Sequence, residues 1–207
     1  WLVWAVGAQG AAVEVNNRVL DLGGSGDHVR LPPAGFTNFH QATIEAWVKW
    51  DRFQHMSRVF DFTLKDSLIN LQNRGSGPDL YSEVFRSGEW LSLQVTSVLL
   101  TNEWVHVALT VEPEAMRVYR NGGLLSDQRV RDPDTFGSTN YSRLNLLGRG
   151  NAKVVWTEDK DFSGQIDEVR VWDHVRTEAQ IRDNLSKQLT GTEPGLVGLW
   201  NFDDGTA

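Results

Sequence analysis

Two adjacent carboxylates, Asp167 and Glu168, stand inside an apolar stretch that runs from Asp161 to Trp172. The stretch is typical of a β-strand, because β-branched and aromatic residues dominate it and Gly164 is its one breaker. Its alternation changes phase at the two carboxylates, so the strand either buries both faces or carries a one-residue bulge. A bulge would leave carbonyls unpaired beside two carboxylates, and calcium prefers such oxygen ligands. The alternative is an ordinary central strand with a solvated acidic pair.

A second set of oxygen ligands lies in the turn from Gly23 to Asp27, which is rich in glycine. It combines flexible backbone carbonyls with the Asp27 carboxylate, and this set also suits calcium. A phosphate-binding loop is excluded, because the turn lacks the Lys-Ser/Thr ending and the helix that such a loop needs. The five histidines show no metal-ligand spacing, and the chain has no cysteine.

Aromatic residues divide into core candidates and ligand candidates. We predict that the tryptophans inside strand patterns belong to the core, namely Trp47, Trp104, Trp172 and Trp200. Aromatic residues in or beside loops are better placed to stack against a sugar ring. These ligand candidates are Trp156, Trp90, Tyr141 and Tyr81. The alternative for each of them is a loop-packing role.

The elements that must position these residues are short alternating strands separated by Gly, Pro and Asn turns. They predict an all-β fold, a two-sheet antiparallel β-sandwich of the jelly-roll kind. One short peripheral helix is predicted to begin with a capping box between Thr177 and Gln180 and to end at Gly191. Residues 19–207 then form one domain, and residues 1–18 are an edge strand, a linker or a signal remnant.

Charge and hydropathy exclude several classes of partner. The net charge of -7 argues against nucleic acids and anionic membranes. No run approaches the ~20 apolar residues that a membrane span requires, so we expect no membrane insertion.

Six motifs then occur in an order that is itself informative. They are Leu20-Asp-Leu-Gly-Gly-Ser-Gly-Asp-His-Val29, Thr43-Ile-Glu-Ala-Trp-Val48, Glu103-Trp-Val-His-Val-Ala-Leu-Thr110, Val118-Tyr-Arg-Asn-Gly-Gly123, Phe162-Ser-Gly-Gln-Ile-Asp-Glu-Val-Arg-Val-Trp172 and Arg176-Thr-Glu-Ala-Gln-Ile-Arg182. Together they resemble the laminin-G-like, concanavalin A-like jelly-roll domains, which are relatives of the pentraxins. The resemblance implies a secreted or cell-surface domain that binds glycans or proteins and often holds calcium. It also implies that the strand of Asp167 lies near the turn of Asp27, which makes these two residues the expected calcium ligands.

The chain departs from the resembled families in ways that limit its chemistry. Pentraxins carry a disulfide, and they bind calcium through an acidic run after a Leu-Gly like Leu147-Gly148. Here that run reads Arg149-Gly150-Asn151, so a pentraxin-type phosphocholine site is not expected. The Glu-x-Asp-x-x-Glu pattern of glycosidases on this sandwich is also absent from the sequence.

We therefore expect a non-catalytic, extracellular recognition module. It would bind glycans or glycoconjugates through loops at one end of the sandwich, with a structural calcium ion. The first alternative is a protein-adhesion or spacer module in a multidomain surface protein. The second is a glycoside hydrolase whose carboxylates the sequence does not reveal. The segment from Gly195 to Gly205 resembles the end of one such domain or the start of the next, so tandem domains are expected.

Overall fold

The computed structural model describes residues 17–32, 41–64, 67–86, 89–129, 144–151 and 158–204. One sheet contains β1 (Leu20–Gly23), β3 (Ala42–Trp50), β8 (Val105–Glu112), β9 (Ala115–Arg120), β10 (Gly123–Arg129), β12 (Ser163–Trp172) and β13 (Leu196–Trp200). The other contains β2 (Val29–Leu31), β4 (Arg58–Leu64), β5 (Ser67–Asn73), β6 (Leu80–Arg86), β7 (Glu89–Val95) and β11 (Asn145–Leu147). The helix α1 spans Glu178–Asp183.

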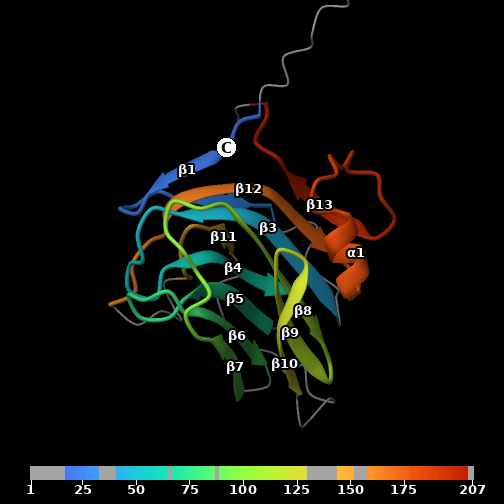
Figure 1. Ribbon diagram of the computed structural model, residues 1–207, viewed down its shortest axis with the longest axis horizontal. Coiled ribbons are helices and arrows are strands. Elements are labelled where there is room, and N and C mark those ends of the chain that lie inside the picture. Colours follow the sequence, from blue (N-terminus) through green and yellow to red (C-terminus); the bar gives the residue numbers. More distant parts are fainter. Residues whose placement is uncertain are drawn as a thin grey trace, which may run out of the picture.

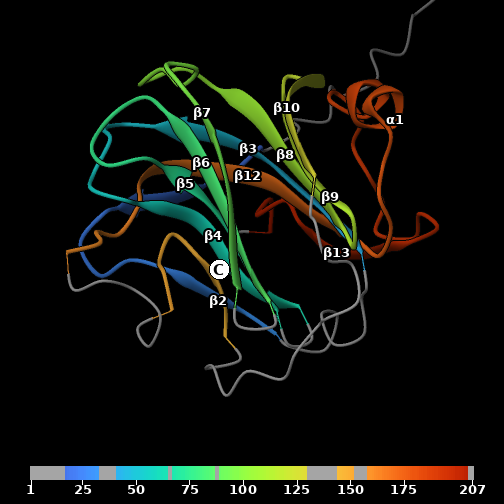
Figure 2. The same cartoon turned by 90° about the horizontal axis from the view of Figure 1, so that it is seen from below.

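The strand order brings distant parts of the chain together. The seven-stranded sheet has the order β1-β12-β3-β8-β9-β10, with β13 also paired to β12, and the six-stranded sheet has the order β2-β11-β4-β5-β6-β7. The ladders between these strands are antiparallel. Figures 1 and 2 show the two sheets stacked face to face, with α1 outside the stack near β13. The predicted antiparallel sandwich with non-adjacent pairing is confirmed.

The core lies between the sheets and is filled by alternate residues of each strand. In β3, the side chains of Ile44, Val48 and Trp50 are 0% exposed. The Trp50 ring packs edge-on against Phe162, with 5.7 Å between the ring centroids. Each sheet thus has one apolar face toward the core and one outward face, where a binding site can form.

The change of side-chain phase in β12 is a β-bulge. The sequence leaves two explanations open, a strand buried on both faces and a one-residue bulge. The register of β12 against β3 shifts between Asp167 and Arg170. Glu168 takes up the extra length with a φ of 49°. Because of the bulge, Val169 and Val171 enter the core although their parity differs from that of Ile166.

The helix α1 begins as predicted and ends earlier than predicted. Thr177 and Gln180 form both bonds of the capping box, at 2.8 and 3.2 Å. The helix stops at Asp183, so the prediction that it reaches Gly191 is wrong. The chain turns after Asp183 because the carbonyls that follow the helix bond to Arg170 of β12 instead.

The predictions for residues 1–16 lie outside the described residues. Among the residues that the structure does describe, no helix has the length and apolar character to cross a lipid bilayer.

Candidate functional site

The outward side of β5, β6 and β7 carries polar and aromatic side chains in cross-strand register. On β5, Ile69 and Leu71 belong to the core, so the residues between and after them point outward. The same alternation applies to β6 and β7, where Val84 and Leu93 face the core. We call the outward residues the polar face, and they are Asn70, Gln72, Tyr81, Glu83, Phe85, Trp90, Ser92 and Gln94.

Glu83 lies at the centre of the polar face, where three side chains donate to its carboxylate. Its Oε2 accepts from Asn70 Nδ2 and from Gln72 Nε2, each at 3.3 Å. Its Oε1 accepts from the Tyr81 hydroxyl at 3.0 Å. Gln72 is 0% exposed, and its Oε1 has no hydrogen-bond partner within the described structure. These bonds fix the side chains before a ligand arrives, which lowers the entropic cost of binding.

Trp90 forms an exposed aromatic surface at the edge of the polar face. It stands opposite Phe85 in the β6–β7 ladder, with 4.8 Å between ring centroids and an interplanar angle of 50°. The Trp90 side chain is 45% exposed, whereas Phe85 is buried beneath it. A ring that is held by a neighbour and open to solvent can accept a sugar ring on its face.

The structure brings two of the predicted ligand residues together on this face. Tyr81 is the second residue of β6 and Trp90 the second residue of β7, so both stand on strands beside loops, as expected. The guanidinium of Arg74 stacks on the Tyr81 ring at 4.3 Å, and burial raises the pKa of the phenol, which keeps it protonated as a donor. The other two candidates, Tyr141 and Trp156, lie outside the described residues.

A buried ionic cluster adjoins the polar face on β4. Arg58 Nη1 donates to Asp159 Oδ2 at 2.6 Å, and Arg58 Nε lies 3.3 Å from Asp61 Oδ2. Asn151 donates to Asp61 from its backbone N–H and from Nδ2, each at 3.0 Å. Burial raises the pKa of the Asp61 carboxyl, against the opposing effect of Arg58 and Asn151. The cation that balances these two carboxylates is therefore a guanidinium.

The polar groups of the Asp27 turn are engaged by other protein groups. Asp27 Oδ2 accepts from the Gly23 N–H at 2.9 Å. The carbonyl oxygens of Gly23 and Gly24 accept from Arg52 Nη2 and Gln54 Nε2, each at 3.0 Å. These carbonyls are the oxygens that the sequence offered to calcium.

A cationic side chain also lies beside this turn. Arg149 makes two bonds to Asp161, Nε to Oδ1 at 2.9 Å and Nη2 to Oδ2 at 2.8 Å. The Gly26 N–H donates to Asp161 Oδ2 at 2.8 Å. The bonds from Arg149 make the largest contribution to lowering the pKa of Asp161. With the carbonyls of Gly23 and Gly24 and one oxygen of Asp27 already bonded, and with a guanidinium nearby, the turn of Asp27 does not fit a calcium ion.

The structure does not bring Asp27 and Asp167 together. Asp27 follows Gly23, which ends β1, whereas Asp167 follows Ile166, the β12 partner of Leu20 at the start of β1. The two carboxylates therefore flank opposite ends of the β1–β12 ladder.

Asp167 itself lies at the bulge among other oxygen atoms. It accepts from the Glu168 N–H at 2.8 Å and from Asn17 Nδ2 at 3.3 Å. Burial is the main reason that its pKa is raised to about 6, and the charges of Glu168 and Asp203 add to the effect. Within the described ranges, no group of three or more His, Cys, Asp or Glu side chains is placed to hold a metal ion.

These contacts give a prediction for calcium. We expect the thermal unfolding midpoint to be the same in saturating calcium and in excess chelator, because Arg149 already supplies the positive charge beside Asp27. Differential scanning calorimetry at low ionic strength measures this, with magnesium as the matched control ion. A midpoint that rises with calcium alone would show that the native state binds the ion, as the sequence resemblance implies.

Two tryptophans that were predicted for the core lie instead on the outward side of the seven-stranded sheet. Trp104 is 38% exposed. Trp47 is half-buried, and its Nε1 donates to the Leu185 carbonyl at 3.1 Å. The core prediction is wrong for both residues, because a strand of alternating Trp and Val has two apolar faces and the core takes only one of them.

Sequence reasoning also missed Asn70, Gln72 and Glu83. The available signal was the alternation of Asn70 and Gln72 with Ile69 and Leu71, which assigns the amides to the face opposite the core. No local pattern, however, relates Glu83 to these amides, since their meeting depends on the β5–β6 register.

A family model described as the concanavalin A-like lectin/glucanases superfamily matches residues 23–182. No curated protein sequence gives a significant match.

Solved structures with the same sandwich give three comparisons. A Bacteroides ovatus protein named as a candidate carbohydrate-binding protein is 28% identical with a TM-score of 0.66, and the match covers 87% of this chain and 51% of that one. This chain thus spans about half the length of that protein. Domain 4 of an extracellular arabinanase from Geobacillus stearothermophilus, solved with arabinotriose, is 23% identical with a TM-score of 0.60 over 75% of this chain and 71% of that one. A heptameric pentraxin from Limulus polyphemus is 15% identical with a TM-score of 0.61 over 84% of each chain.

Proposed function

The chain belongs to the concanavalin A-like lectin/glucanase superfamily, and on that premise we propose that it is a non-catalytic carbohydrate-binding module whose saccharide site is the polar face. The observation that carries this proposal is the exposed Trp90 ring beside the hydrogen-bonded Glu83 carboxylate. Trp90 offers an apolar platform to the face of a sugar ring. Glu83 and Ser92, which are less buried than the amides beneath them, offer a carboxylate and a hydroxyl to the sugar hydroxyls.

The comparisons support this choice of ligand class. Two of the similar structures are named for saccharide binding, one as a candidate carbohydrate-binding protein and one as an arabinanase domain bound to arabinotriose. The net charge of -7 favours a neutral saccharide over an acidic polymer, because like charges repel.

The arrangement of carboxylates supports binding without hydrolysis. Cleavage of a glycosidic bond needs two carboxyl groups that both reach the bond. Asp61 and Glu83 are two strands apart on either side of Asn70. Asp61, however, is 1% exposed and is held by Arg58 and Asn151, so a sugar oxygen does not reach it. An assay for released reducing sugar is therefore expected to stay at background with every polysaccharide that the protein binds.

We place this module outside the cell, as one unit of a longer surface or secreted chain. The arabinanase that carries a similar domain is extracellular by name, and the similar Bacteroides protein is about twice as long as the part that matches. If the purified domain captured a surface protein and no glycan, the protein-adhesion alternative would replace the present proposal.

The first test of the polar face is the Trp90→Ala variant. We expect it to lower the affinity for soluble neutral polysaccharides at least tenfold, since aromatic residues that anchor a binding surface contribute about 2 kcal/mol or more. Affinity electrophoresis with xylan, arabinan and galactomannan measures the change. Leu124→Ala is the matched control, because Leu124 is also 45% exposed but lies on β10 of the other sheet. Equal retardation of both variants would contradict a polar-face site.

A further inference from the structure

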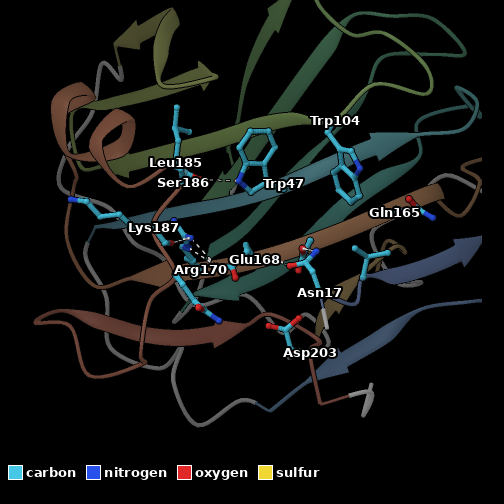
Figure 3. A pocket seen from close by; sticks show the side chains of 13 residues that line it. Asn17, Trp47, Trp104, Gln165, Glu168, Arg170, Leu185, Ser186, Lys187 and Asp203 are labelled. Carbon is cyan, nitrogen blue, oxygen red and sulfur yellow. Dashed lines mark hydrogen bonds and ion pairs between the residues drawn. The ribbon is translucent and has the colours of Figure 1, made fainter. Parts of the chain in front are cut away.

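A groove of about 570 Å³ lies on the outward side of the seven-stranded sheet, on the opposite side of the sandwich from the polar face. Its volume falls within the range of small-molecule sites. The sheet forms its floor, and the segment from Leu185 to Gln188 after α1 forms one wall. Figure 3 shows the rings of Trp47 and Trp104 on one side of the groove and Asn17 and Asp203 on the other. We call it the outer groove.

Two indole rings give the outer groove a firm apolar surface. Trp47 is fixed by the bond from its Nε1 to the Leu185 carbonyl and by edge contact with His106, at 5.5 Å between ring centroids. Trp104 is 38% exposed, and Lys49 Nζ lies 5.8 Å from its ring centroid. Trp90 and Trp104, two of the most exposed large apolar side chains in the described ranges, therefore lie on opposite faces of the sandwich.

Polar side chains surround these rings at defined strand positions. The register pairs Asp167 with Trp47 and Gln165 with Lys49. Gln165 and Asp167 thus point to the same side of β12 and present an amide and a carboxylate along one edge of the indole surface. This combination of a flat aromatic ring, amides and a carboxylate is the chemistry that recognises sugar hydroxyls.

The charges around the outer groove nearly cancel, which favours an uncharged ligand. Glu168 is neutralised by Arg170, whose Nη2 lies 2.8 Å from Glu168 Oε2. The other charged groups there are the carboxylates of Asp167 and Asp203 and the ammonium groups of Lys187 and of Lys49, which lies beside Trp104. A strongly anionic or cationic ligand would add a charge that this nearly neutral set does not balance.

From these features we propose that the outer groove is a second saccharide site, which takes a neutral oligosaccharide of at least two sugar units. The minimum number of sugar units follows from the spacing of the strands in the sheet. Trp104 directly precedes β8, which lies two strands from Gln165 and Asp167 on β12, or about 10 Å away at the usual strand spacing. One sugar ring stacked on Trp104 does not reach those residues, whereas a second linked ring does.

The consequence is that one domain can hold two saccharide chains, since its sites face in opposite directions. This consequence rests on the proposed function of the polar face. The proposal that the outer groove binds a saccharide does not depend on that function. Two sites on one rigid domain would cross-link a polysaccharide without any oligomer, and they would raise its apparent affinity through multivalency.

The test measures each face separately in the whole chain. Calorimetric titration with xylan, arabinan and galactomannan oligosaccharides is done on the parent protein, Trp90→Ala, Trp104→Ala and the double variant, with Leu124→Ala as control. We expect two sites in the parent and in the control, one in each single variant and none in the double variant. Trp104→Phe, which keeps an aromatic face, should keep the second site with affinity reduced by less than tenfold, and this separates lost stacking from lost folding.

The possible failures are distinguishable. If Trp104→Ala binds like the parent while Trp90→Ala loses all binding, the outer groove is not a saccharide site. If Trp104→Ala loses all binding while Trp90→Ala keeps it, the outer groove stands and the polar-face function fails. If the parent binds none of these sugars but forms a dimer that Trp104→Ala abolishes, the groove is a protein interface and the inference is overturned.

Discussion

Replacing Glu45 with glutamine is expected to lower the free energy of unfolding by about 3–5 kcal/mol, because it leaves buried guanidinium groups without their counter-charge. Glu45 is 0% exposed on the outward side of β3. Its Oε1 accepts from Arg176 Nη1 at 2.9 Å and from Trp172 Nε1 at 2.8 Å. Arg176 also stacks on the Trp172 ring at 3.9 Å. The amide that replaces the carboxylate keeps the shape and removes the charge.

The loss should extend beyond one ion pair, since this network holds the helix α1 on the sheet. Arg176 Nη2 donates to the Gln180 carbonyl of α1 at 3.1 Å. Arg170, whose charge also acts on Glu45, donates to the carbonyls of Asn184 and Lys187 after α1, at 2.9 and 2.8 Å. Lys187 belongs to the segment that walls the outer groove, and Asn184 directly precedes that segment. Glu45→Gln is therefore expected to weaken saccharide binding in the outer groove as well as stability.

Urea unfolding followed by tryptophan fluorescence measures the effect. The matched control is Glu112→Gln, which makes the same chemical change in the same sheet at a surface ion pair with Arg117, and it should cost less than about 1 kcal/mol. The Arg176→Gln change and the double variant complete a cycle that isolates the coupling between the two residues. Losses of equal size for Glu45→Gln and Glu112→Gln would show that the buried network does not hold α1.

The features of this fold that could be predicted are those that depend on residues close together in the sequence. The bulge at Asp167 and Glu168 was visible because a change in side-chain phase within one strand is itself a sequence signal. The capping box at Thr177 was visible for the same reason, since its two residues are three positions apart. Both features depend on neighbours in the sequence, and the structure confirms both.

The candidate site depends on pairings between distant segments, and the sequence does not specify these. Glu83 meets Gln72 only because β5 and β6 pair in one register, and a slip of one residue would turn Glu83 to the core. Glu45, Trp172 and Arg176 meet across more than 120 positions, so no spacing rule indicates their contact. The expected joint site of Asp27 and Asp167 came from the resemblance, and the β1–β12 register separates those residues.

The second large effect is expected from Gly164→Ala in β12, which should lower the free energy of unfolding by about 3 kcal/mol. Gly164 has a φ of 152°, which L-residues with a side chain rarely adopt. A Cβ placed there would lie 2.1 Å from the Lys49 carbonyl oxygen and 2.8 Å from Cζ of Phe162. The backbone oxygen cannot rotate away as a flexible side chain would, so β3 and β12 must move apart.

Gly75→Ala separates this clash from simple backbone strain. Gly75 also has a positive φ, of 57°, but nothing lies within 4 Å of a Cβ built there. Its substitution should cost only the strain of that backbone region, about 1 kcal/mol. Thermal or urea unfolding of both variants gives the comparison, and similar losses for the two would mean that β12 and β3 tolerate separation.

Gly164→Ala also tests whether the two faces of the sandwich bind saccharide independently. The next residue, Gln165, pairs with Lys49, and these residues lie beside Trp104 at the outer groove. Separation of β12 from β3 should therefore weaken binding there, well below the unfolding temperature. Trp90 and Glu83 lie on the other sheet, whose ladders do not include β12, so polar-face binding should persist. Loss of both activities together in a folded Gly164→Ala protein would show that the faces are coupled through the core, since packed interiors transmit strain.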